Sequence, residues 1–128
     1  MFILTHIIPH IVVPTGTPEN VTASTPSPTS VFLVWNPPTP DQQNGIIITY
    51  YINMTEVETG MVSQRMVTGT TQLLIDNLHP YYVYSFFISA ATTAGQGPYS
   101  PVFTVQTLED GIHLLHDLST KNACNYCQ

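Results

Sequence analysis

Two pairs of side chains near the C-terminus have the types and spacing of metal ligands, His113-x-x-His116 and Cys124-x-x-Cys127. Two histidines and two cysteines can complete a tetrahedral zinc site. The same Cys-x-x-Cys spacing supports thiol–disulfide exchange in thioredoxin-like proteins, but that chemistry requires a βαβ context, which is missing here. The segment is also too short to build a shell around a metal. We therefore expect a linker at these residues, with neither a metal nor another cofactor.

A second group with potential chemistry is the carboxylate pair Glu56 and Glu58. Residues two apart on a strand point to the same side, and we expect this pair to face solvent at the end of a strand. The sequence contains no Gly-x-Ser-x-Gly elbow, no phosphate-binding loop, no His-Glu-x-x-His motif and no dinucleotide fingerprint. Gly95-x-Gly97 lacks a third glycine and precedes Pro98, so it predicts a turn. We expect no enzyme activity and no small-molecule substrate.

Two Asn-x-Thr sequons, at Asn20 and Asn53, are candidate sites for N-linked glycosylation. The alternation that turns Tyr50 and Ile52 inward turns Asn53 outward, where a transferase could reach it. A chain this rich in Ser and Thr contains roughly one or two sequons by chance, so their number alone is not informative. The position of Asn53 makes it the better candidate.

The composition excludes several classes of partner. Lys and Arg together number 2, and the formal net charge is −6, whereas a nucleic-acid binder needs a basic face to displace counterions from phosphate. The same shortage argues against docking on anionic lipid. No apolar run reaches the length of about 18 residues that a membrane span requires. Residues 1–13 are apolar but lack a basic n-region, so an export signal is not evident in this chain.

Alternating apolar residues predict an all-β fold with one core. Turn signals recur roughly every 8–14 residues, and helical periodicity is absent between them, which is typical of an all-β sandwich. The expected strands are Glu19–Ser24, Ser30–Asn36, Ile46–Met54, Met61–Val67, Thr71–Asp76, Tyr82–Thr92 and Pro101–Thr107. The pattern therefore predicts a seven-stranded antiparallel β-sandwich with irregular N- and C-terminal tails.

The predicted core surrounds Trp35, the one tryptophan of the chain. Its indole is expected to fill the space between two sheets packed about 10 Å apart. In the third expected strand, Ile48 shares the inward face with Tyr50 and Ile52. The expected core residues are Val31, Leu33, Trp35, Tyr50, Ile52, Leu73, Ile75, Leu78, Tyr84, Phe86, Ile88, Phe103 and Val105.

Several short motifs, in order along the chain, resemble the fibronectin type III family. They are Pro18 with Val21, Val31-x-Leu33-x-Trp35 followed by Pro37-Pro38, Asn44-Gly45-x-Ile47-x-x-Tyr50-x-Ile52, Leu78-x-Pro80-x-x-x-Tyr84-x-Phe86-x-Ile88-x-Ala90, and Gly95-x-Gly97-Pro98-Tyr99-Ser100 with closure at Thr107. The missing pair of sandwich cysteines favours this family over the immunoglobulin type. Tyr84 falls where a tyrosine corner is expected, with its ring inward and its hydroxyl bonded to nearby backbone.

Modules of this kind bind partners through loops or through an exposed sheet face. Residues 92–98 are expected to form a loop that contains Gly95, Gln96 and Gly97. Some family members carry an integrin-binding Arg-Gly-Asp tripeptide in this loop, and its absence here means that this activity does not carry over. A second candidate surface is formed by Tyr51 and Phe87, which alternation turns outward on neighbouring strands. Two scattered surface aromatics are the alternative interpretation of that pair.

We expect three segments: an apolar leader or linker at 1–16, the sandwich at 17–108, and a linker or the truncated start of a following segment at 109–128. The resemblance implies a non-catalytic interaction or spacer module of an extracellular or cell-surface adhesion or receptor-type protein. Its partner would be another protein or a neighbouring tandem domain. Two alternatives stay open, since fold alone does not give function. One is an intracellular spacer module of the kind found in giant muscle proteins. The other is an accessory domain of a larger enzyme such as a receptor-type tyrosine phosphatase.

Overall fold

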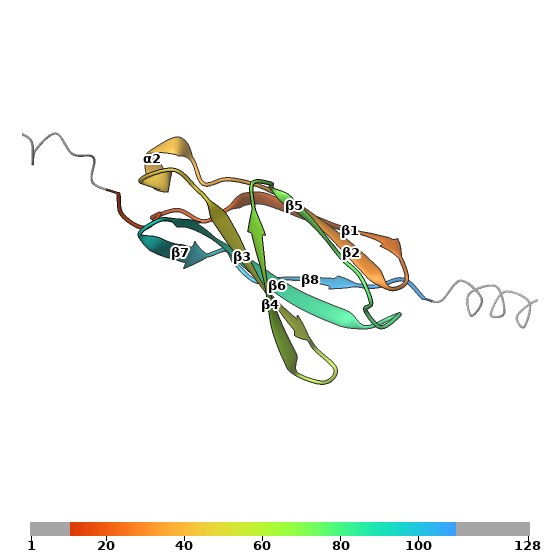
Figure 1. The fold of residues 1–128 in the computed structure, drawn as a ribbon. Coiled ribbons are helices and arrows are strands. Elements are labelled where there is room, and N and C mark those ends of the chain that lie inside the picture. Colours follow the sequence, from red (N-terminus) through yellow and green to blue (C-terminus); the bar gives the residue numbers. More distant parts are fainter. Residues whose placement is uncertain (1–10, 110–128) are drawn as a thin grey trace, which may run out of the picture.

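The computed structural model describes residues 11–109, which form two antiparallel sheets packed as a sandwich (Figure 1). The first sheet has the strand order β1-β2-β5, and the second has the order β4-β3-β6-β7 with β8 also paired to β6. The strands of the first sheet are β1 (Glu19–Ser27), β2 (Ser30–Asn36) and β5 (Gln72–Ile75). Those of the second are β3 (Thr49–Glu56), β4 (Met61–Thr68), β6 (Val83–Thr92), β7 (Gly95–Tyr99) and β8 (Phe103–Gln106). The predicted all-β sandwich is confirmed.

The predicted turn at residues 95–98 is wrong, because the chain is already in β7 there. Thr92 of β6 and Gly95 of β7 pair with each other, so the hairpin turns at the two residues between them. Pro98 is tolerated in β7 because this is an edge strand, where a missing N–H leaves no neighbour unpaired. Residues 11–109 therefore contain eight strands rather than the predicted seven.

Ser100 holds the chain to β6 at the break between β7 and β8. Its N–H donates to the Ile88 carbonyl oxygen at 2.8 Å, and its hydroxyl accepts from the Ile88 N–H at 3.0 Å. Because Pro101 has no N–H, it cannot continue the ladder. The predicted strand Pro101–Thr107 corresponds to β8 alone, and β7 is an additional strand before it; the two pair with the two halves of β6.

The connection between β2 and β3 also differs from its prediction as plain loop. Residues Pro40–Gln43 form one helical turn, α2, which ends at Asn44 in the left-handed conformation (φ 58°). β3 begins only at Thr49. Ile48, expected to face inward, is 40% exposed, and Ile47 packs against the core instead. Strict alternation requires an extended ladder, and both isoleucines precede it. No helix within residues 11–109 is long and apolar enough to cross a membrane.

Trp35 is the centre of the core. It is 1% exposed, and its ring meets the ring of Tyr50 edge to face at a centroid distance of 5.3 Å. Its backbone N–H donates to the carbonyl oxygen of Thr71, 3.0 Å away, which ties β2 to the chain before β5. The buried members of the predicted core are Val31, Leu33, Trp35, Tyr50, Ile52, Ile75, Leu78, Tyr84, Phe86 and Ile88. Leu73, Phe103 and Val105 are partly buried and pack against them.

Residues 11–16, which the sequence places in a leader or linker, lie against one end of the sandwich. We call them the N-terminal strap. The Thr92 hydroxyl donates to the Val12 carbonyl oxygen at 2.9 Å, and the Asn44 side-chain amide donates to the Val13 carbonyl oxygen at 3.0 Å. Pro14 is fully buried. The strap therefore fills the space between the α2 loop and the β6–β7 hairpin (Figure 1).

Replacement of the central indole should remove a large share of the stability of this domain. We expect Trp35→Ala to lower the free energy of unfolding by about 3–5 kcal/mol, because it removes buried apolar area and leaves a cavity between the sheets. Leu74→Ala, at a position that is 52% exposed, should change it by no more than about 0.5 kcal/mol. Urea denaturation followed by circular dichroism measures both. Equal losses for the two variants would contradict the central role of Trp35.

Candidate functional site

The outer face of the second sheet carries an aromatic stripe, which we define as Tyr51, Phe87 and Tyr99. Tyr51 lies opposite Ser89 across β3 and β6, and Ser89 lies opposite Tyr99 across β6 and β7. The rings of Phe87 and Tyr99 meet edge to face at 4.6 Å. Ser89 is fully buried although it points outward, and its hydroxyl donates to the Gln96 side chain at 2.9 Å. The structure thus brings Tyr51 and Phe87 to one face and adds Tyr99, which the expected loop at residues 92–98 did not include.

The residues expected to form a binding loop, Gly95, Gln96 and Gly97, lie instead in β7 beside the strap. A Cβ added at Gly97 would lie 2.6 Å from the carbonyl oxygen of Pro14, and one added at Gly95 would lie 3.4 Å from Val13. Only glycine permits the strap to approach Gly97 so closely. This end of the sandwich is therefore occupied by the chain itself.

Glu56 is the largest departure from the sequence analysis. We expected it to face solvent with Glu58, but its side chain is only 9% exposed. Three donors surround its carboxylate: the Thr59 hydroxyl to Oε1 at 2.6 Å, the Tyr84 hydroxyl to Oε2 at 3.0 Å, and His79 Nδ1 to Oε2 at 2.7 Å. Glu58 is exposed and accepts from a backbone N–H at the start of β6. The prediction for Glu56 was wrong because the alternation that buries the core side of β3 extends to its last residue.

The hydroxyl of Tyr84 joins this carboxylate to the corner before β6. It accepts from the His79 N–H at 2.8 Å and donates to Glu56, which gives the tyrosine corner that the resemblance implies. The Thr107 hydroxyl donates to the His79 carbonyl oxygen at 2.7 Å. The hydrogen bond from Thr59, followed by that from His79, holds the pKa of Glu56 below its ordinary value of 4.5. Burial raises the pKa of Tyr84 above 10.0.

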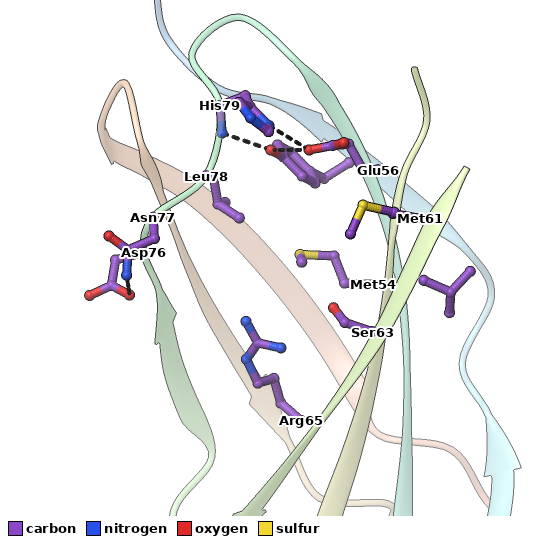
Figure 2. A pocket seen from close by; sticks show the side chains of 11 residues that line it. Met54, Glu56, Met61, Ser63, Arg65, Asp76, Asn77, Leu78 and His79 are labelled. Atoms are coloured by element: carbon purple, nitrogen blue, oxygen red, sulfur yellow. Dashed lines mark hydrogen bonds and ion pairs between the residues drawn. The ribbon is translucent and has the colours of Figure 1, made fainter. Parts of the chain in front are cut away.

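An open groove of about 300 Å³ lies beside this cluster, between β4 and residues 76–79. Figure 2 shows Arg65, Ser63 and Met61 of β4 on one side and the Asp76–His79 corner on the other. Arg65 is the one Lys or Arg in residues 11–109, and it forms no ion pair within that range. The groove thus combines apolar walls with the unpaired Arg65 and the carboxylates of Glu56 and Asp76.

The Glu56–His79 pair has the form of a catalytic carboxylate–imidazole dyad, which needs a nucleophile on the second ring nitrogen. Two hydroxyl side chains line the groove: that of Tyr84 donates to Glu56, and that of Ser63 is buried with no hydrogen-bond partner in the described part of the chain. Both carboxylate oxygens of Glu56 already accept hydrogen bonds. The arrangement therefore fixes the corner, and it does not assemble a nucleophile with a base.

No group of three or more His, Cys, Asp or Glu side chains within residues 11–109 is placed to hold a metal. The four ligands weighed for zinc, His113, His116, Cys124 and Cys127, lie outside the described residues.

The two sequon asparagines lie in different sheets. Asn20 is exposed in β1, in the left-handed conformation (φ 52°), where the register with β2 shifts. Asn53 is partly buried in the middle of β3, on the same face as the aromatic stripe. Its Oδ1 accepts from the Gln64 side chain at 2.8 Å.

Comparison with known proteins identifies the family. The family described as Fibronectin type III domain matches residues 16–106. Tyrosine-protein phosphatase Lar of Drosophila melanogaster is 35% identical over 101 residues, and the cell adhesion molecule DSCAM of Rattus norvegicus is 34% identical over 103 residues. These matches cover 77% and 76% of this chain but only 5% of each relative. The crystal structure of the FN5 domain of Drosophila Lar superimposes with a TM-score of 0.61 and 29% identity, over 75% of this chain and 98% of that chain.

The chain belongs to the fibronectin type III family, whose domain is a non-catalytic module. It spans about a twentieth of the length of the curated relatives that it matches, 5% in each case.

Acid should destabilise the domain through Glu56. Its lowered pKa means that the folded state binds the proton less tightly than the unfolded state. This carboxylate's contribution is therefore complete above pH 4.5 and is lost as the pH falls through the lower folded-state value. We expect Glu56→Gln to lower the free energy of unfolding at pH 7 and to flatten its decline below pH 4.5, as measured by urea denaturation across pH. Glu58→Gln is the matched control, and its free energy of unfolding should still decline below pH 4.5. If Glu56→Gln shows the same decline, Glu56 is not its source.

Gly97→Ala should detach the strap. The added methyl group meets the Pro14 carbonyl group, and such overpacking typically costs about 1–3 kcal/mol. We expect lower stability in urea and faster hydrogen exchange at the Thr15 N–H, which donates to the Gln42 carbonyl oxygen at 2.9 Å. In a chain that starts at residue 16, the same substitution should cost much less. If the substitution lowers the free energy of unfolding equally with and without the strap, a clash with Pro14 is not the cause.

Proposed function

We propose that this chain is a non-catalytic extracellular module of a cell-surface receptor or adhesion protein and works in line with neighbouring modules. The observation that carries this proposal is the path of the chain. Residue 11 and residue 109 lie at opposite ends of the elongated sandwich (Figure 1). A module whose two ends lie far apart adds its full length to a row of consecutive modules. A module whose two ends lie side by side would instead reverse the direction of the row.

The relatives support the cell-surface part of the proposal. One is a cell adhesion molecule, and another is a phosphatase whose solved domain is numbered FN5. Each is far longer than the matched segment, which fits a unit that occurs beside others. The phosphatase match also keeps the accessory-domain alternative open, because a module in a receptor-type phosphatase would be extracellular and non-catalytic as well.

The surfaces differ in how freely they could receive a partner protein. The strap fills the end that includes β7, which argues against recognition there. The groove beside β4 is open, and its unpaired Arg65 would favour a partner that brings a carboxylate to this side chain and keeps it away from Glu56 and Asp76, which line the same groove. A substitution in the groove is therefore the best way to test whether the module binds a partner or acts only as a spacer.

Labelling of intact cells tests the proposed location. We expect the full-length parent protein to react with a membrane-impermeant biotin reagent on unbroken cells, because the module would lie outside. Labelling only after permeabilisation would overturn the proposal and favour the intracellular spacer. An abundant cytosolic protein that stays unlabelled on intact cells is the control.

Aggregation of cells that display the parent protein then separates the two roles. If the module binds a partner through the groove, Arg65→Glu should reduce aggregation, and Gln72→Glu, at an exposed position of β5, should not. If it acts as a spacer, both variants should aggregate normally, and deletion of residues 11–109 should reduce aggregation. Normal aggregation after the deletion would contradict both roles in adhesion.

A further inference from the structure

We propose that Asn53 carries an N-linked glycan whose first sugars lie on the aromatic stripe and cover the outer face of the second sheet. This inference rests on the proposed extracellular function, because N-linked glycans are added in the export pathway. It differs from the two earlier expectations for this face, a protein-docking patch and scattered aromatics. The covering group would be attached to the chain itself.

The register places Asn53 among the residues that the glycan would contact. Asn53 lies directly opposite Phe87 on β6 and opposite Gln64 on β4. Residues two apart on a strand share a face, so Tyr51 and Thr55 flank Asn53 on the outer side. The asparagine and the threonine of the sequon are thus presented together, next to two members of the aromatic stripe.

The amide of Asn53 is oriented for attachment. Its Oδ1 accepts a hydrogen bond from Gln64 Nε2 at 2.8 Å. Nδ2, the other polar atom of this amide, forms no hydrogen bond within residues 11–109. The atom that would receive the sugar is therefore free to react, and its residue lies opposite Phe87.

The covalent step uses a co-reactant that the export pathway supplies, a lipid-linked pyrophosphate oligosaccharide. Nδ2 forms a bond to C1 of the first N-acetylglucosamine, the bond from C1 to the pyrophosphate oxygen breaks, and the amide loses one proton. The lipid pyrophosphate leaves with the bonding electrons. Oxidation states do not change, and this chain supplies the nucleophile at Asn53 and the Thr55 hydroxyl that completes the sequon.

The chemistry of the face suits a neutral sugar better than a charged protein surface. The outward residues of β4, β3 and the middle of β6 are all uncharged: Val62, Gln64, Met66, Thr68, Tyr51, Asn53, Thr55, Ser85, Phe87 and Ser89. Met66, opposite Tyr51, is 65% exposed. The C–H faces of a pyranose ring and its acetamido methyl group can cover such apolar surface and remove it from water. Ring hydroxyls can meanwhile bond to the Thr and Gln side chains.

The first experiment measures occupancy. The full chain, fused to an export signal, is secreted from eukaryotic cells, and the second sequon is removed with Thr22→Ala. We expect a mobility shift that an N-glycosidase reverses. Thr55→Ala should abolish the shift, and the matched Thr55→Ser should keep it, because Ser also completes a sequon. A secreted chain with Asn53 unoccupied overturns the inference and leaves the proposed function intact, since occupancy is measured independently of the parent's location.

The second experiment measures coverage of the stripe. Oxidative footprinting should label Met66 and Tyr99 less in the glycosylated chain than in the enzymatically deglycosylated chain. Deglycosylation should also lower the melting temperature by about 4 °C or more, and Phe87→Ser should remove most of that difference. Equal footprints and melting temperatures with and without the glycan would overturn the proposed contact.

Discussion

The fold depends on one packing constraint, the enclosure of Trp35 between two sheets that differ in size. The indole is 1% exposed and meets Tyr50 of the opposite sheet edge to face. The first sheet has the order β1-β2-β5, and β4 and β7 are edge strands of the second. An open groove lies between β4 and residues 76–79, and β7 is covered by the strap. The arrangement of the two sheets around Trp35 thus determines which surfaces are available to partners.

Sequence alone could predict this core because alternation and burial agree along most of each strand. Val31, Leu33 and Trp35 are buried as a period of two requires. The same rule of alternation predicts that Glu56 is buried, because this residue continues the inward side of β3 beyond Met54. The expectation that Glu56 faces solvent rests on its place beside Glu58 at the end of a strand, and an unpaired buried charge would indeed be costly. Its three donors come from Thr59, His79 and Tyr84, and no local pattern reveals that they meet.

The errors at the other end of the sandwich have a different physical origin. The glycines of β7 were interpreted as turn residues, because glycine most often marks a turn. At Gly97 the glycine instead permits close approach of Pro14, which is far away in the sequence. Ile48 was placed inward by extending alternation beyond the ladder into residues that do not yet pair as β3. In both cases a local rule failed because a distant segment, the strap or the neighbouring strand, determines the conformation.

These features divide the surface of the sandwich by chemistry. The outer face of the second sheet is aromatic and uncharged, and a side chain there can receive a sugar. The groove holds Arg65, the single cation of the described residues, with no ion pair. A covered outer face would leave that groove open for contact, while the opposite positions of residues 11 and 109 keep it to the side of an in-line array. A lateral partner can then reach the module without competing with its neighbours in the chain.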